Sequence, residues 1–151
     1  MEITDAIKIS GSLHLEIVNK YGVVTDVYDF DNLITNVGYL VTAQAIAGVA
    51  GVGINRVAVG TSSTSPNSNN TSITNAVYVN VKSVEYPAPT RPEIKVVVVF
   101  NFEVDYLVAV GMNIYEFGLI TQDNRLFSRW TRALIQKTNE MKLVGRWTVN
   151  L

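Results

Sequence analysis

The sequence contains no cysteine and only one histidine, and these scarcities remove several kinds of chemistry at once. Without cysteine there is no disulfide framework, no thiol nucleophile and no cysteine-based zinc site. The single histidine, His14, lies in a strand-like stretch, and no motif of an activated serine accompanies it. No metal or cofactor motif is visible either. We therefore expect a protein that is not an enzyme and that uses no cofactor.

Charge is scarce as well. Asp, Glu, Lys and Arg make up 17% of the chain, whereas 48% is hydrophobic and the formal net charge is −1. A chain without a basic excess has no field that would attract nucleic acid or an anionic membrane. A surface short of charge fits two interpretations equally well. Either a partner covers part of it, or neutral Thr, Asn and Ser side chains face the water.

Long apolar runs are also missing. The longest, residues 96–100, is far shorter than the ~20 apolar residues that cross a membrane. Residues 1–5 are acidic and lack the apolar core of a secretory signal. We expect a protein made in the cytosol and exported by no obvious route, with no membrane partner. The length of 151 residues predicts one domain, 1–151, whose core needs no covalent or metal support.

What the sequence does contain is strand signal. Apolar residues alternate with polar ones over most of the chain, and turn residues separate the runs at regular spacing. Such a pattern predicts a mainly β fold, an antiparallel β-sandwich of the jelly-roll kind. The expected strands are 12–17, 23–30, 54–59, 77–82, 93–105, 113–121, 126–134 and 141–151, and the apolar middle of 93–105 predicts cover on both faces.

One segment has the period of a helix. Apolar residues between Leu33 and Ile46 predict a helix over residues 35–47, with Asn32 or Thr35 as the N-cap and Gly48 at the C-terminal end. A long surface loop should follow at 61–70, where nearly every residue is Ser, Thr or Asn. These side chains satisfy their own backbone, so we expect the loop to point outward and to bury nothing.

The two ends of the chain carry opposite charge. Residues 1–31 hold six acids and two bases, a net of −4, while residues 125–146 hold six bases and one acid, a net of +5. Three explanations remain open: pairing within the fold, contacts between subunits, or binding of a polyanion. For contacts between subunits, the candidates are a basic surface and an acidic counter-surface. The first comprises Arg125, Arg129, Arg132, Lys142 and Arg146, and the second Asp26, Asp29 and Asp31.

Five short motifs occur in a recognisable order. They are Asn32-Leu33-Ile34-Thr35-Asn36-Val37-Gly38, Ile54-Asn55-Arg56-Val57-Ala58-Val59-Gly60-Thr61, Glu116-Phe117-Gly118-Leu119-Ile120, Leu126-Phe127-Ser128-Arg129 and Gly145-Arg146-Trp147-Thr148-Val149. In this order they resemble a diffuse group of bacteriophage virion proteins, usually described as tail-fibre or generic structural proteins. The similarity extends over nearly the whole chain, although each motif is short and mostly apolar.

The resemblance implies a non-enzymatic structural protein of the virion, assembled in the host cytoplasm, and it carries over no catalytic residues. No collagen-like, coiled-coil or repeat segment is present to build a fibre shaft. The leading interpretation is therefore an oligomeric capsid decoration (cement) protein, for instance a trimer, that binds copies of itself and the major capsid protein. The first alternative is a small tail component such as a fibre base, baseplate or adaptor protein.

A second alternative is a carbohydrate-binding module that recognises a glycan receptor. Such a module would need exposed aromatic side chains on which a sugar ring can stack. The candidates are Tyr78, Tyr86, Tyr106, Tyr115 or a tryptophan. Trp130 and Trp147 lie in predicted strands, and we expect both in the core.

Overall fold

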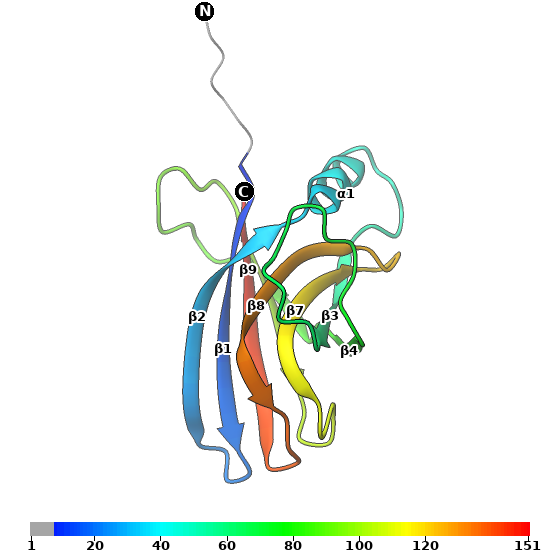
Figure 1. The fold of residues 1–151 in the computed structure, drawn as a ribbon. Helices are drawn as coiled ribbons and strands as arrows, with labels where there is room; N and C mark the ends of the chain where they lie inside the picture. The colour runs from blue at the N-terminus through cyan, green and yellow to red at the C-terminus, as the bar shows by residue number, and fades with distance from the viewer. Residues whose placement is uncertain (1–7) are drawn as a thin grey trace, which may run out of the picture.

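The computed structural model describes residues 8–151, and Figure 1 shows a strongly curled β-sheet with one helix at its upper end. All nine strands form a single sheet in the order β4-β3-β7-β8-β2-β1-β9-β6-β5, and every pair of neighbours is antiparallel. The mainly β, antiparallel fold with one helix is therefore confirmed. The elements are β1 (Ser10–Asn19), β2 (Val24–Ile34), α1 (Asn36–Ile46), β3 (Ile54–Gly60), β4 (Val77–Asn80), β5 (Ser83–Glu85), β6 (Val97–Val104), β7 (Asn113–Thr121), β8 (Leu126–Gln136) and β9 (Met141–Asn150).

The expectation of two separate sheets is not confirmed, because β2 joins the two halves into one half-barrel. Residues Val24 to Asn32 of β2 pair with β1. Only its last two residues, Leu33 and Ile34, pair with β8, opposite Arg129 and Ser128. Alternating sequence cannot reveal this continuity, since the same apolar face suits a sandwich or a curled sheet. We call β5-β6-β9-β1-β2 the first half and β8-β7-β3-β4 the second half.

The core lies between the inner faces of these two halves. Leu13, Leu15 and Trp147 of the first half are fully buried together with Ile114 and Phe117 of the second half. In β1 the residues between them, Ser12, His14 and Glu16, stay half-buried on the outer face, as the period of two in a strand requires. Trp130 is buried as well, so the prediction that both tryptophans belong to the core is confirmed.

Local sequence signals place the ends of α1 correctly. Thr35 is the N-cap, and its Oγ1 accepts a 2.9 Å hydrogen bond from the backbone N–H of Gly38. After Ala47, Gly48 adopts a positive φ of 81°, the left-handed conformation that ends many helices. Among residues 8–151, no helix has the length and apolar character needed to span a membrane.

None of residues 61–70 is buried, as the composition of the polar loop after β3 predicts. The loop runs across the outer face of the second half, in front of β7 and β8 in Figure 1. Ile73, near its end, is buried in a small second core with Ala58, Ile120 and Leu126. Gly118 of β7 leaves room for it, since a Cβ there would lie 2.8 Å from Ile73 Cγ1. Residues 61–70 therefore stay exposed or half-exposed, and Ile73, which follows them, attaches this part of the chain to the sheet.

Candidate binding groove

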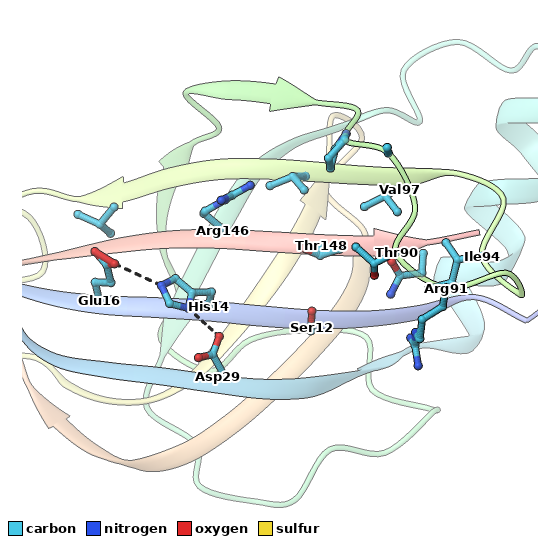
Figure 2. Close-up of a pocket in the computed structure, with 15 residues that line it drawn as sticks. Ser12, His14, Glu16, Asp29, Thr90, Arg91, Ile94, Val97, Arg146 and Thr148 are labelled. Carbon is cyan, nitrogen blue, oxygen red and sulfur yellow. Dashed lines mark hydrogen bonds and ion pairs between the residues drawn. The ribbon is translucent and has the colours of Figure 1, made fainter.

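The first half carries a hollow of about 590 Å³ on its outer face, a volume typical of ligand sites. Its floor comes from neighbouring strands whose outward side chains lie in register. Ser12, His14 and Glu16 of β1 pair with Thr148, Arg146 and Val144 of β9, and Val97 and Val99 of β6 continue the floor. Asp29 of β2 stands opposite His14 and closes the other side. Figure 2 shows these side chains rising from adjacent strands toward one space.

The segment 86–96, between β5 and β6, forms a wall and partial roof over this floor. Pro87, Arg91 and Ile94 line the hollow, with Val97 and Val99 buried beneath. The predicted cover on both faces of this strand is thus confirmed. Leu151 holds the segment in place, because Lys95 N donates to Leu151 O at 2.7 Å.

A second hollow of about 880 Å³ continues the first toward the end of the sheet. Ser12, Arg91, Ile94 and Asn150 line both, so the two form one groove parallel to β1. Its charged groups are balanced: four basic side chains face four acidic ones, with His14 in addition. They are Lys8, Arg91, Lys95 and Arg146, and Glu16, Asp29, Asp31 and Glu93.

His14 links two acidic side chains of the groove. Its Nδ1 lies 2.6 Å from Asp29 Oδ1, and its Nε2 lies 3.3 Å from Glu16 Oε1. The hydrogen bond to Asp29, supported by Glu16, raises the pKa of His14 above its usual 6.5, although burial works in the opposite direction. Both ring nitrogens face carboxylates, an arrangement that favours the protonated ring.

Metal binding has no support in this geometry. Within residues 8–151, no group of three or more His, Asp or Glu side chains is arranged to hold a metal ion. Asp29 and Asp31 share the outer face of β2, as the register with His14 and Ser12 requires, whereas Asp26 pairs with the inward residue Ile17. The three acids predicted as one counter-surface therefore lie on two faces. Glu2 and Asp5, counted in the acidic end, fall outside the described residues.

The predicted basic surface is not a single surface either, and Arg129 must be removed from it. Arg129 is only 3% exposed, and its Nε donates to Glu116 Oε2 at 2.8 Å. Its other nitrogens donate to Asn70 Oδ1 and Thr64 O, so it fastens the polar loop to the sheet. Arg125 is engaged on the same side, with Asp123 at 2.8 Å and Gln44 at 2.7 Å.

The remaining three cations also have partners within the chain. The guanidinium of Arg132 lies over the ring of Tyr28, 3.8 Å from its centre. Lys142 Nζ lies 3.8 Å from Glu103 Oε1, and Arg146 Nη2 lies 3.3 Å from Glu85 Oε2. None of these acids belongs to the predicted counter-surface. A direct pairing between the two ends does exist at Lys20 and Glu140, 3.2 Å apart.

Residues from the motifs that resemble phage virion proteins lie together at the junction of the two halves. With its amide oriented as its partners require, Asn32 accepts from Trp147 Nε1 and donates to Gly11 O and Ser128 Oγ. Thr35 Oγ1 donates to Leu126 O at 2.7 Å, and Glu116 Oε1 accepts from the amides of Ser62 and Thr74. These positions hold the β2–β8 junction and the loop, so the geometry gives them an architectural role.

Two features escaped the sequence reading. Lys137 is fully buried, with its Nζ 2.9–3.1 Å from the carbonyl oxygens of Asp105, Tyr106 and Thr138, and burial lowers the pKa of this lysine. The groove is the other, since it joins residues from five segments of the chain. The sequence feature that could have indicated the groove was the strand at 93–105, which is apolar on both faces and is preceded by prolines.

Comparisons of this chain with protein-family models, with curated proteins and with solved structures find no match.

Proposed function

We propose that this chain is a non-enzymatic structural protein of a bacteriophage virion, and that it decorates the capsid. The order of the motifs supports the virion part of the proposal. The part concerning assembly is supported by one structural observation, the open edge of β2. A decoration protein stabilises a shell by mass action, because it binds the assembled lattice and not the free subunits.

β2 is paired along one side and largely uncovered along the other. Only Leu33 and Ile34 pair with β8, so the residues from Val24 to Asn32 have a strand neighbour on one side only. Val24, Val27 and Phe30 remain exposed, as do Tyr21 and Val23 in the preceding turn. Exposed apolar strand edges favour pairing with another chain, and isolated proteins usually protect them.

Side chains close the seam between β2 and β8 only in part. Phe30 packs on Trp130 with ring centres 5.2 Å apart, and Tyr28 stacks under Arg132. Phe30 nevertheless stays 46% exposed. Because the predicted basic residues are engaged within the chain, we propose β2 and its turn, rather than those cations, as the docking surface for the capsid or a second copy.

Copy number tests the proposal. Purified particles of the phage that encodes this chain would be analysed by quantitative mass spectrometry, relative to the major capsid protein. A ratio near one, or a simple fraction of it, is expected for a decoration protein. A few copies per particle would place the chain in the tail as a fibre base, baseplate or adaptor component. Its absence from the particle would refute the virion role altogether.

Incorporation of variants tests the docking surface. Val27→Glu places a charge on the exposed edge of β2 and is expected to reduce incorporation strongly, while the isolated protein stays folded. Val84→Glu is the matched control, since Val84 is similarly exposed on β5 at the opposite edge of the first half. Equal incorporation of both variants would exclude the β2 edge as the docking surface.

A further inference from the structure

The groove of the first half is not explained by a structural role in assembly. We propose that it binds a neutral oligosaccharide, recognised by side chains alone. Three properties of the groove lead to this ligand class: the state of its backbone, the balance of its charges and the stiffness of its roof.

The two central strands of the floor, β1 and β9, have no free backbone hydrogen-bonding groups. β1 lies between β2 and β9, and β9 lies between β1 and β6, so both strands are paired on both sides. An extended peptide gains much of its affinity by adding a strand to a free edge. β1 and β9 cannot provide one, and the free edge of β2 lies on the side of β2 away from the floor. A ligand here must be held by side chains, and that favours a molecule that carries its own polar groups along its length.

The charges of the groove exclude a strongly ionic ligand. Four basic groups and His14 are mixed with four acidic groups, and several of them are already paired: His14 with Asp29 and Glu16, and Arg91 with Glu93 at 3.4 Å. A polyanion would meet carboxylates that repel it. Paired charged groups still offer spare donors and acceptors, and hydroxyl groups, which both donate and accept, can use them.

The uncharged side chains of the lining suit both the hydroxyl groups and the C–H groups of a sugar. Ser12 and Thr148 supply hydroxyls on the floor, while Val97, Val99 and Ile94 provide apolar patches between the polar groups. Sugar rings present C–H faces as well as hydroxyls, so a floor that mixes both kinds of side chain suits them. Recognition would rest on hydrogen bonds and these contacts, because none of the tyrosines and tryptophans named as stacking candidates lines the groove. Such a site differs from the aromatic platform expected of a carbohydrate-binding module.

The segment 86–96, which forms the roof, is preorganised in the free protein. Pro87, Pro89 and Pro92 fix three φ angles within the segment, and Ile94 N donates to Arg91 O at 3.1 Å. A stiff roof loses little conformational entropy when a ligand enters, and such preorganisation increases affinity.

The test uses an array of immobilised neutral, sialylated and sulfated oligosaccharides, followed by NMR titration of the protein with each oligosaccharide that binds. We expect binding to neutral members, with shifted amide signals at β1, β9 and the segment 86–96. Arg146→Gln and Thr148→Val should each weaken binding about tenfold, the effect of one lost hydrogen bond. Arg56→Gln, an equivalent change on β3 in the second half, should leave it unchanged.

Several results would overturn the proposal: no binding on the array, binding to acidic members only, or shifts that map elsewhere. Loss of particle incorporation in Arg146→Gln without any glycan binding by the wild type would instead identify the groove as a protein contact. The outcome is separable from the proposed function, because copy number in the virion does not depend on whether the isolated protein binds sugar.

Discussion

The role of a charged residue in this protein depends on which groups neutralise its charge. Glu116 and Arg129 illustrate this, since they are buried together and each also binds the loop through amides, an amide oxygen or a carbonyl. A buried pair of this kind adds little net stability over an apolar pair, yet removal of one partner leaves a charge without compensation. The main effect of the pair is therefore to fix the position of the loop, and it adds little to the free energy of unfolding.

The first prediction concerns this pair. Arg129→Met should lower the free energy of unfolding by about 3–5 kcal/mol, because Glu116 then stays buried and unpaired. The double variant Glu116→Gln/Arg129→Met should be more stable than Arg129→Met, since the glutamine oxygen can still accept from Ser62 and Thr74. Urea unfolding measures both. A double variant less stable than the single one would contradict the assigned role.

The second prediction concerns His14 and pH. Because its pKa is raised in the folded protein, the stability that it contributes is fully present below its unfolded value of 6.5 and is lost as the pH rises through the folded value. His14→Gln should therefore destabilise the protein more at about pH 5.5 than at about pH 9. Asp29→Asn removes the main cause of the shift and should weaken this pH dependence. A loss from His14→Gln that is equal at both pH values would show that the ring acts by packing alone.

At the scale of elements, helix α1 shows how a local signal becomes a tertiary contact. Thr35 caps the helix as its sequence position predicts, but its hydroxyl also donates to Leu126 O and its amide donates to Phe127 O. One residue thus starts the helix and attaches it to β8. Gly38, one turn later, lies so close to Phe127 O that a side chain there would collide with the backbone of β8.

The third prediction follows from this double role. Thr35→Ala should cost about 2 kcal/mol, because both the cap and the buried bond to β8 are lost. Thr35→Ser keeps the hydroxyl and should cost clearly less. Unfolding in urea gives the energies, and hydrogen exchange at the Gly38 amide reports the cap itself. Equal losses in the two variants would mean that the methyl group, rather than the hydroxyl, stabilises this site.

At the scale of the whole molecule, two halves of one sheet share a core but differ on their outer faces. The polar loop and Ile73 cover the second half, and the segment 86–96 covers only part of the first half and leaves the groove. The edge of β2 has no such cover. The proposed docking surface and the proposed ligand groove both lie on the less covered half, and β2 contributes to both, since Asp29 and Asp31 line the groove.

The sequence by itself determined most of the local structure. Period, turn residues and caps located α1 and eight of the nine strands, with β7 placed at its observed bounds and only the short β5 missed. These features depend on neighbours within a few residues, which the sequence shows directly. The burial of both tryptophans and the double cover of β6 followed from the same periodicity.

Only the tertiary structure decided which distant residues meet. The basic residues at 125–146 looked like one surface, yet Arg129 is buried between the loop and the sheet and the others have separate partners. The continuity of the sheet through Leu33 and Ile34, the fastening of the loop and the groove around His14 arose in the same way. Strand order and register set these contacts, and a periodic pattern alone does not specify which strands become neighbours.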